Sequence, residues 1–595
     1  MTSILSKEQS SGTVLGVERS ASGVRWTWRT QDERLVQAYV QQLSVSPTLA
    51  RVLIGRDVAL EEADNFLNPS LKRGLPNPSH LLDMDKAAER FADAILKKEI
   101  VGVLGDYDVD GATSSALLVR YLMSLGIETH VYIPDRMKDG YGPNEKAMDW
   151  FAEKKAKLVM TVDCGATAHA PLAYGSGLGL EVIVLDHHLG AAELPKAYAV
   201  VNPNRLDESS EHTYLAAVGV TFLFLVAVNR ILRLQGFFAS HAEPDLKAWL
   251  DLVALGTVCD VVPLKGANRA FVAQGLKAMG FQQNMGLRHL STVARITPEY
   301  TCYHAGFMLG PRINAGGRVG ESGLGVRLLT LEDESEVQRL AEQLNILNAE
   351  RQAIELMVLE QALEQAERQL NRALLMLEGA WHAGVVGIVA GRLKEKYQRP
   401  VAVIAHDGEM GKASARSVHG VDFGAAVGAA RTEGLVVTGG GHAMAAGFTV
   451  RRDGISRLHD YFETRLSEAI TRYGETRSYR IDDCVAVTGI NVSLSEELAK
   501  AAPYGMGNPE PRIVVPEVFI MEMDILKDAH IRMQVTGKNG GGRLKCMAFR
   551  AVGTPLGDFL LQSHGKPMHL AGTVRAEFWN GKNYVTLHVE DAAVT

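Results

Sequence analysis

The sequence predicts an α/β protein in which two parallel-sheet α/β lobes are joined by a long helix and followed by a small C-terminal β-barrel. Three observations support this fold class. Apolar β-rich runs alternate with helical patterns, a long amphipathic stretch contains neither Gly nor Pro, and the end of the chain consists of short strand patterns and turns. Alternation of β and α patterns is typical of βαβ units in a parallel sheet.

Length and composition limit the class of protein. The 595 residues suffice for about four domains. With 46% hydrophobic and 22% charged residues, the composition excludes collagen-like, coiled-coil and disordered chains. The net charge is −7, so any surface for nucleic acid must be local. Five widely spaced cysteines form neither a CxxC pair nor a disulfide framework, which favours a reducing cytoplasm.

The first element is an N-terminal helical region, expected over residues 1–95, with short helices broken by Pro and Asn. Its beginning lacks the apolar segment of a secretory signal. One apolar stretch, 212–229, reaches the lower limit of membrane length. Spanning a bilayer would separate the motifs at Asp186 and Asp260, which are expected to meet. We therefore predict a buried core helix and no membrane association.

Within the first lobe, expected over residues 96–325, three β-rich runs each end in ionisable residues. IVGVL precedes an Asp triplet, LVMTV precedes a single Asp, and VIVL precedes Asp-His-His: Asp106, Asp108 and Asp110; Asp163; Asp186, His187 and His188. Ligands bind beyond the carboxyl ends of parallel strands, so these side chains are expected to converge. Asp260, which ends the apolar run DLVALGTVCD, is expected to join them.

Converging carboxylates cannot all stay ionised without a compensating cation. Hard oxygen ligands with one imidazole favour Mn²⁺ or Mg²⁺ over Zn²⁺, and carboxylates bridging two ions form a clamp for phosphoryl displacement. Each of these motifs alone could also have a purely structural role, since an isolated DxDG is more often an Asx turn than a metal site. Their joint occurrence at successive strand ends favours a metal site. The neighbouring Cys164 and Cys259 are interpreted as small core residues.

A long connecting helix is expected over residues 326–378, where Val337, Leu340, Leu344 and Leu347 recur at helical spacing. About 40 residues would extend roughly 60 Å and could bridge two lobes. The alternative is a core helix folded back on one domain. The second lobe, expected over 379–474, contains a Gly-rich turn at 439–442 whose N–H groups would suit a phosphate. A purely structural tight turn is the alternative there.

The β-barrel is expected over residues 475–595. From Ile525 to Val585, nine Lys or Arg face three acids, a local charge of +6, and aromatic residues lie between them. Cations with aromatics on a small barrel suit a groove for single-stranded nucleic acid. The alternative is a solvated charged face above core aromatics.

A resemblance follows from longer motifs. GDYDVDGATSS, TVDCG, LDHH, LGTVCDVVPL, GPRINAGGR and GGGHAMAAGF, in this order, resemble the DHH phosphoesterase superfamily. PYGMGNPEP and the C-terminal β-domain narrow the resemblance to the bacterial RecJ family of single-strand-specific exonucleases, over about residues 45–590. This implies a DHH catalytic domain (96–325), a DHHA1 domain (379–474) and an OB-like DNA-binding barrel (475–595).

The resemblance implies roles for individual residues. The metal ligands would be Asp108, Asp110, Asp163, His187 and Asp260, and the catalytic residues around them His188, Arg312, Asp106 and Asp186. Phosphate binding would fall to Arg136, Ser414, Arg416, Gly440, Gly441 and His442. The charge and aromatic pattern of the barrel, rather than the resemblance, predicts the single-strand groove residues Arg543, Lys545, Phe549, Arg575 and Lys582. Some relatives have a histidine four residues before the first ligand acid; this chain has Leu104.

The implied activity is 5′→3′ exonuclease digestion of single-stranded DNA to 5′-mononucleotides, with two Mn²⁺ or Mg²⁺ ions, in recombination and repair. The resemblance also implies a single-stranded-DNA-binding protein and a RecQ-type helicase as partners. We further expect a monomer, located in the cytoplasm. The alternative within the enzyme class is a DHH/DHHA1 phosphodiesterase acting on short oligonucleotides or cyclic dinucleotides. A replisome scaffold relative that has lost its ligands is disfavoured, because all five ligand positions match.

Overall fold

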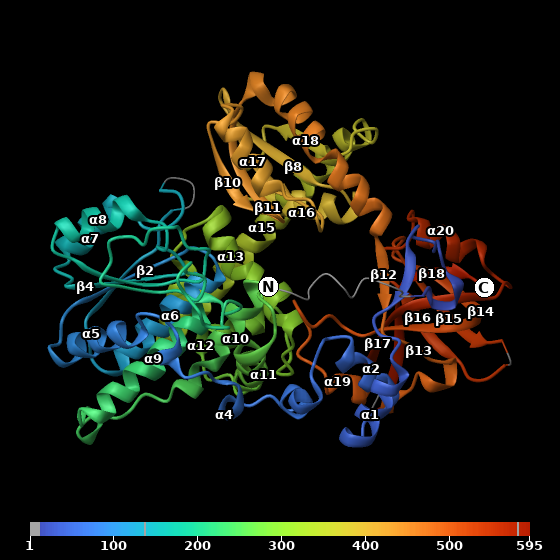
Figure 1. Cartoon of the computed structure of the whole chain (residues 1–595), viewed down its shortest axis with the longest axis horizontal. Helices are drawn as coiled ribbons and strands as arrows, with labels where there is room; N and C mark the ends of the chain where they lie inside the picture. Colours follow the sequence, from blue (N-terminus) through green and yellow to red (C-terminus); the bar gives the residue numbers. More distant parts are fainter. Residues whose placement is uncertain (1–11, 136–138, 539, 580–581) are drawn as a thin grey trace.

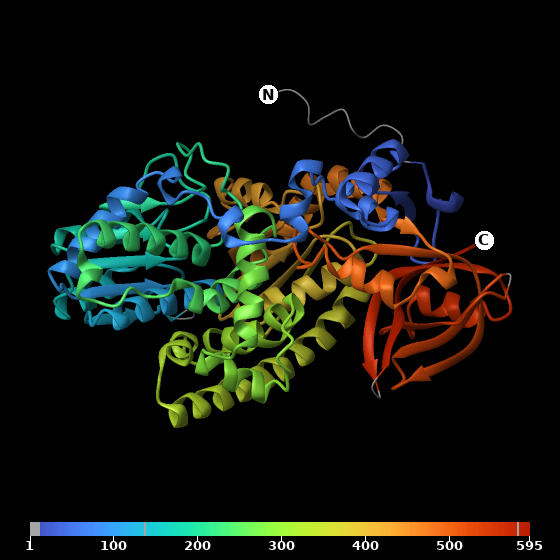
Figure 2. The same ribbon diagram turned by 90° about the horizontal axis from the view of Figure 1, so that it is seen from below.

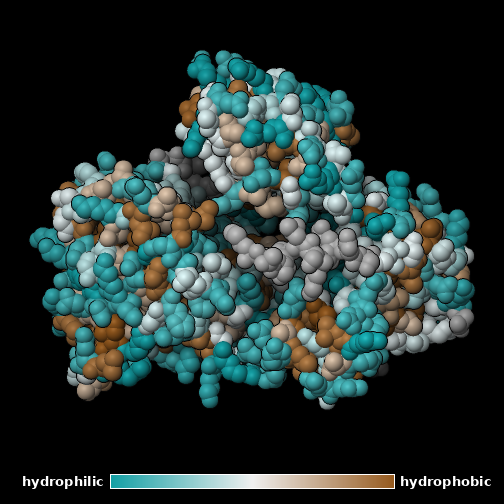
Figure 3. Space-filling model, viewed as in Figure 1, coloured by the Kyte–Doolittle hydropathy of each residue, from teal (hydrophilic) through white to brown (hydrophobic). Residues whose placement is uncertain are grey.

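The computed structural model describes residues 12–135, 139–538, 540–579 and 582–595, with Phe578, Trp579 and Lys582 described by their backbone alone. A first α/β lobe, a second α/β lobe and a β-barrel are arranged around a common centre (Figure 1). The space-filling view shows a hollow where these three parts face one another (Figure 3). The predicted α/β class with a C-terminal barrel is confirmed.

The first lobe is built on a five-stranded, all-parallel sheet of order β3-β2-β4-β5-β6. Its strands are β2 (Val101–Gly105), β3 (Thr129–Tyr132), β4 (Leu158–Val162), β5 (Glu181–Leu185) and β6 (Ala199–Val201). One face packs against α5 (Met84–Leu96), α6 (Val109–Ser124) and α9 (Ala217–Leu234). The other packs against α7 (Glu145–Glu153) and α8 (His169–Gly177). Helices on both faces explain the continuous apolar strands.

Helix α9 corresponds to the apolar stretch of membrane length. By length and composition this helix could span a bilayer, but 72% of its 18-residue apolar stretch is buried inside the protein. Phe222, Phe224 and Leu225 belong to the largest core cluster of the first lobe. The prediction of a buried core helix is confirmed.

The second half of the first lobe is helical and shares a core with the start of the long helix. It contains α10 (Leu250–Cys259), α11 (Gly266–Gly280), α12 (Met285–Val293), the π-helical turn η6 (His304–Leu309), α13 (Gly310–Val319) and α14 (Leu324–Thr330).

The long helix α15 (Glu334–Glu367) has 34 residues, fewer than the predicted 326–378. Its N-cap is Asp333, whose carboxylate accepts a hydrogen bond from the Glu336 N–H. Its first turns pack in the core of the first lobe, and Val358, Ala362 and Ala366 pack in that of the second. The helix therefore bridges the lobes, as predicted, over about 50 Å.

The second lobe has a five-stranded sheet of order β10-β11-β9-β8-β7. Its strands are β7 (Leu375–Gly379), β8 (Val401–Asp407), β9 (Met410–Arg416), β10 (Thr438–His442) and β11 (Ala445–Arg451). Only β7 and β8 pair in parallel. The expectation of a parallel sheet thus holds for this pair alone, because two-residue hairpins join β8 to β9 and β10 to β11. Helices α16 (Val386–Tyr397), α17 (Phe423–Thr432) and α18 (Ile455–Thr476) complete the lobe.

The C-terminal strands close into a barrel, because β14 pairs with both β15 and β17. The barrel strands are β14 (Arg512–Leu526), β15 (His530–Gly537), β16 (Leu544–Ala548), β17 (Met568–Trp579) and β18 (Lys582–Val594). Short β13 (Asp483–Cys484) and helices α19 (Val492–Ala499) and α20 (Pro555–Gln562) accompany them. Closure leaves these strands without a free edge, as in small nucleic-acid-binding barrels.

The sequence predicted one N-terminal helical region over residues 1–95. The structure instead divides this region between two parts of the molecule. Strand β1 (Arg25–Trp28) pairs in parallel with β12 (Ser478–Ile481), and the Trp26 indole donates to Asp591 at 2.8 Å. Helix α1 (Glu33–Leu43) packs on α2 (Pro47–Ile54), whose Leu49 and Val52 enter the barrel core. The short helices α3 (Ala63–Leu67) and α4 (Leu71–Gly74) lead on to α5 in the first lobe. Helices α1 and α2 accordingly lie beside the barrel (Figure 1), and the N-terminal segment lies next to it in the second ribbon view as well (Figure 2).

The barrel is also fixed to the first lobe. The buried Arg269 of α11 donates to the carbonyls of Ala501 and Ala502 at 2.9 and 2.7 Å. The Leu264 N–H donates to the Met506 carbonyl at 2.8 Å. The PYGMGNP segment therefore packs directly on the chain that follows Asp260.

Candidate active site

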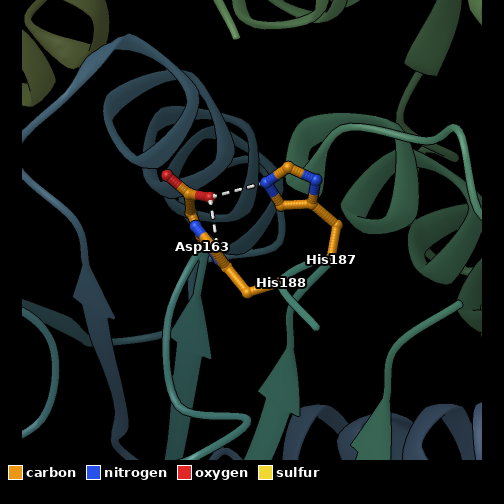
Figure 4. A group of neighbouring side chains, drawn as sticks. All are labelled: Asp163, His187 and His188. Carbon is orange, nitrogen blue, oxygen red and sulfur yellow. Dashed lines mark ion pairs between the residues drawn. The ribbon is translucent and has the colours of Figure 1, made fainter. Parts of the chain in front are cut away.

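The ionisable residues at the ends of β2, β4 and β5 converge as predicted. These three strands are neighbours in the parallel sheet, so their carboxyl ends open at one edge. In each of three groups, the possible ligand atoms lie within 4.8 Å of one another: Asp106, Asp108 and Asp163; Asp163, His187 and His188; Asp110, His187 and Asp260. Figure 4 shows the two imidazoles directed toward the Asp163 carboxylate.

Helix termini hold the first acids in place. Asp108 is the N-cap of α6, and its carboxylate accepts the Gly111 N–H at 3.1 Å. Both Asp110 oxygens accept N–H groups at the start of α9, from Ala217 at 2.7 Å and Val218 at 2.9 Å. A helix N-terminus is favourable for an anion. This interaction also explains why the apolar helix α9 is placed at the site.

Close helix packing brings Asp260 to the same point. A Cβ atom at Gly256 of α10 would lie 3.0 Å from Asp110 Oδ1 and 2.3 Å from Thr113 Oγ1. Only glycine allows α10 to pass α6 at this distance. Asp260 follows one turn later as the C-cap of α10.

His187 lies at the centre of the cluster. Its Nε2 is 3.4 Å from Asp163 Oδ1 and 3.4 Å from Asp260 Oδ2. These three atoms are buried and have no hydrogen-bond partner among the residues that the structure describes. Buried polar atoms without partners are unfavourable unless an ion satisfies them. The carboxylate-rich donor set with one imidazole therefore fits divalent Mn²⁺ or Mg²⁺.

The protonation equilibria agree with a site built for cations. Burial, together with neighbouring carboxylates, raises the pKa of Asp110 to about 7 and that of Asp260 to about 9, and also raises the pKa of Asp163. Burial and the adjacent His188 lower the pKa of His187 to about 4. Its imidazole is therefore neutral and available as a ligand near neutral pH.

His188 belongs to a different environment. Its Nδ1 lies 2.7 Å from Asp186 Oδ1, and Asp186 also accepts the backbone N–H groups of His187 and Ala166. Burial opposes ionisation of Asp186, but the hydrogen bond and charge of His188 prevail and bring its pKa to about 2. Although burial opposes it, the same hydrogen bond raises the pKa of His188. The His188 side chain is 40% exposed, so it can contact a substrate.

Tyr141 is a site residue that sequence reasoning missed. Its hydroxyl donates to the Asp163 carbonyl at 2.8 Å and lies 3.2 Å from His188 Nδ1. The residue belongs to the segment PDRMKDGYG, in which the sequence pointed only to Arg136. No periodicity or strand end marks it, so only the fold places it. Arg136 itself lies outside the described residues.

Arg312 lies on α13, which borders the site. A Cβ atom at Gly310 would lie 2.4 Å from Cys259 Sγ, and one at Gly317 would lie 3.2 Å from Tyr107. Arg312 donates to Asn345 Oδ1 at 2.9 Å and to the Met308 carbonyl at 2.6 Å. Both acceptors are uncharged, so the guanidinium keeps its full charge for a phosphate.

The second lobe brings part of the predicted phosphate site together. Ser414, Arg416 and Gly441 line a hollow of about 340 Å³ beside the N-terminus of α16. Arg416 donates to Ser414 Oγ at 3.0 Å. Gly440 and His442 lie on the same sheet, but residues 439–442 form the edge strand β10 rather than the predicted turn. Three consecutive glycines suggested a turn, whereas all three pair with residues of β11.

The barrel divides the predicted groove residues. Arg543 and Lys545 line a hollow of about 570 Å³, and Lys545 pairs with Glu577 at 2.9 Å. Arg575 faces a different hollow and pairs with Glu510 at 2.5 Å. Phe549 is 55% exposed, with its ring 5.4 Å from that of His530. The Lys582 side chain lies outside the described part.

The local +6 overstates the free charge of the barrel. Arg575, Arg532 and Lys538 pair with Glu510, Asp524 and Glu517, respectively, and these acids precede the counted segment in sequence.

Leu104, at the position where some relatives have histidine, is fully buried in β2 among core residues. It offers no ligand atom.

The fold and the carboxylate centre define a DHH-type phosphoesterase. The DHH family N-terminal domain matches residues 100–257, the DHHA1 domain matches 370–468 and the RecJ OB domain matches 481–591.

Full-length relatives narrow the class further. The chain is 35% identical to the single-stranded-DNA-specific exonuclease RecJ of Escherichia coli, covering 84% of this chain and 89% of the relative. It is 31% identical to RecJ of Bacillus subtilis, covering 97% and 71%. The crystal structure of RecJ from Thermus thermophilus in complex with Mn²⁺ superposes with a TM-score of 0.79 at 30% identity, covering 95% and 79%. The chain belongs to the RecJ family.

Proposed function

We infer that this chain is a single-stranded-DNA-specific exonuclease, a hydrolase that cleaves phosphodiester bonds with two Mn²⁺ or Mg²⁺ ions. The observation that carries this proposal is the meeting of Asp163, His187 and Asp260 with unsatisfied ligand atoms at one point. Family membership and the closed barrel supply the substrate class. RecJ of Thermus thermophilus has been crystallised with Mn²⁺ and with Mg²⁺.

Each residue group has a distinct task. Asp108, Asp110, Asp163, His187 and Asp260 would hold the ions, with Asp106 beside them. Bound divalent ions supply the activated nucleophile and Lewis acidity for in-line displacement at phosphorus. Asp186 would orient His188 through their 2.7 Å contact and favour its protonated form. A protonated His188 and the charged Arg312 would donate hydrogen bonds to the phosphoryl oxygens, where negative charge develops.

The finer parts of the proposal concern the strand and its cell biology. Ser414, Arg416 and the β10 edge would bind the 5′-terminal phosphate, so that digestion proceeds 5′→3′ and releases 5′-mononucleotides. A charge-assisted contact from Arg416 suits this phosphate. We also propose that the protein acts in recombination and repair, together with a single-stranded-DNA-binding protein and a RecQ-type helicase. It would do so as a monomer in the cytoplasm.

The test is digestion of end-labelled single-stranded DNA in Mn²⁺, Mg²⁺ or EDTA, with duplex DNA, single-stranded RNA and a dinucleotide as comparison substrates. The proposal expects mononucleotides from the 5′ end of long single strands, and no cleavage in EDTA. Faster turnover of the dinucleotide than of the long strand would instead support the short-oligonucleotide phosphodiesterase. Activity in EDTA would contradict the metal site.

A further inference from the structure

Val261, the residue directly after the proposed metal ligand Asp260, has a strained backbone. Its φ angle is +60°, in the left-handed region that residues with a branched Cβ rarely adopt. A left-handed residue commonly follows the C-cap of a helix, but that residue is usually glycine. The Val261 side chain is 58% exposed, so its own packing offsets little of the strain. Contacts elsewhere must therefore hold this conformation.

The conformation of Val261 matters because it determines how helix α10 ends. Asp260 is the C-cap of this helix, and its backbone N–H donates to the Gly256 carbonyl at 2.9 Å. The Val261 N–H donates to the Val258 carbonyl at 3.3 Å, a long bond that holds the last turn only weakly. If Val261 relaxed to a negative φ, this bond would be lost and the last turn would fray. The Asp260 carboxylate would then no longer be held among the other ligands.

A turn that leads into the barrel, at residues 505–508, supports the chain after Val261. Two backbone hydrogen bonds between its first and last residues, at 2.9 and 3.1 Å, close this turn. Its Met506 carbonyl accepts the Leu264 N–H at 2.8 Å. Gly507 lies against Pro263, since a Cβ atom at Gly507 would be 3.3 Å from Pro263 Cβ. The 505–508 turn therefore fixes the chain just beyond the strained residue.

The 505–508 turn is itself anchored to helix α11. The side-chain amide of Asn508, which is 1% exposed, donates to the carbonyls of Ala501 and Pro503, both at 2.8 Å. The buried Arg269 of α11 donates to the same two carbonyls, at 2.9 and 3.3 Å. Helix α11 starts two residues after Leu264. The turn and the helix that follows the strained segment therefore form one connected network.

We propose that the 505–508 turn positions Asp260 for metal binding by keeping Val261 in its left-handed conformation. The turn belongs to the domain that is proposed to bind DNA, so this domain would also contribute to metal affinity in the first lobe. Asp260 forms a group of possible ligands with Asp110 and His187, so the effect should concern one of the two ions. The inference rests on the proposed function, because it takes the carboxylate centre to bind divalent ions.

The experiment measures Mn²⁺ binding by the full-length chain without DNA, from the electron paramagnetic resonance signal of the free ion. Gly507→Ala brings a Cβ atom against Pro263. Gly565→Ala is the matched control, because φ is +77° at Gly565 and +75° at Gly507, and a Cβ atom at Gly565 meets nothing within 4 Å. Gly505→Ala adds no positive-φ strain and places a Cβ atom 2.8 Å from Leu264 Cδ1, so it tests the same turn if Gly507→Ala does not fold. Thermal melts show which variants are folded.

Gly507→Ala should bind one Mn²⁺ ion about tenfold more weakly than wild type and the other ion equally well. A left-handed L-residue costs free energy of this order, since tenfold is about 1.4 kcal/mol. Gly505→Ala should weaken the same ion by about threefold, because a flexible side chain can partly yield, and Gly565→Ala should weaken neither. Adding Val261→Gly to Gly507→Ala should restore the affinity, because glycine keeps a positive φ without strain. Digestion of single-stranded DNA by Gly507→Ala should need about tenfold more Mn²⁺, with kcat at saturating Mn²⁺ within about twofold of wild type.

Equal Mn²⁺ affinity of Gly507→Ala and wild type would overturn the inference, as would an equal loss in Gly565→Ala or an equal weakening of both ions. Failure of Val261→Gly to restore the affinity would also overturn it. A wild type that binds no Mn²⁺ would overturn the inference together with the proposed function. If wild type binds Mn²⁺ but cuts no single-stranded DNA, the proposed function alone fails, and the Mn²⁺ affinities still decide the role of the turn.

Discussion

Replacing Asp260 with Asn should stabilise the metal-free protein while impairing its activity. Asp260 lies at the C-terminal end of α10, where the helix dipole disfavours an anion. Burial, Asp110 and Asp108 raise its pKa from 3.8 to about 9. One pKa unit is about 1.4 kcal/mol, so at pH 8 this group costs the folded, metal-free protein on the order of 5 kcal/mol.

The direction of the pH effect follows from proton binding. Because their pKa values are raised, Asp110 and Asp260 bind more protons in the folded, metal-free protein than in the unfolded chain, from about pH 4 to about 7 for Asp110 and to about 9 for Asp260. Both carboxyl groups contribute their full stabilisation of the folded, metal-free protein below their unfolded pKa of 3.8. This stabilisation is lost as the pH rises through the folded pKa values, about 7 for Asp110 and about 9 for Asp260. Divalent ions that bind the ionised carboxylates should restore it.

Thermal melts at pH 5 and pH 8, with EDTA or Mn²⁺, measure this effect. Wild type in EDTA should melt at least about 5 °C lower at pH 8 than at pH 5, and Mn²⁺ should raise its Tm most at pH 8. Asp260→Asn should melt higher than wild type in EDTA at pH 8 and gain less from Mn²⁺. A metal-free wild type whose stability is unchanged from pH 5 to pH 8 would refute the reasoning.

Three further changes have defined outcomes. Arg416→Ala should slow digestion of 5′-phosphorylated DNA at least about tenfold more than digestion of 5′-hydroxyl DNA, compared in parallel time courses. Arg543→Ala should reduce the salt dependence of single-strand binding by about one unit of slope, whereas Lys545→Ala, whose ammonium is paired with Glu577, should change it less. Truncation after Glu475 should lower the Tm as well as the DNA affinity, because β1 loses its partner strand β12 and α2 loses the barrel core. An unchanged Tm of the truncated protein would contradict that packing.

The convergence of the proposed metal ligands could be predicted because parallel-strand geometry is local and regular. Each acid follows a short apolar run, and parallel strands open at the same edge. The sequence therefore placed Asp108, Asp163 and His187 together without knowledge of the loops. Tyr141 escaped prediction because its contact with Asp163 depends on the path of a loop.

Long-range pairing explains the other differences. Strand β1 pairs with β12 from more than 400 positions away, so no local pattern could show that the N-terminal region belongs partly to the barrel. Charge counting along the sequence missed Glu510, which folds back onto Arg575. The glycines of β10 suggested a turn because their edge-strand pairing depends on β11.

The most direct test of a metal-dependent carboxylate centre is the Asp163→Ala variant, assayed for hydrolysis and for binding of the same labelled single strand. Asp163 belongs to two of the three groups of possible ligand atoms, whereas DNA affinity is distributed over many phosphate contacts. We expect hydrolysis in Mn²⁺ to fall by at least about 10³-fold, because the attacking and leaving oxygens lose their clamp. Single-strand binding in EDTA should stay within about threefold of wild type. Near-normal turnover of Asp163→Ala in Mn²⁺ would contradict the assignment.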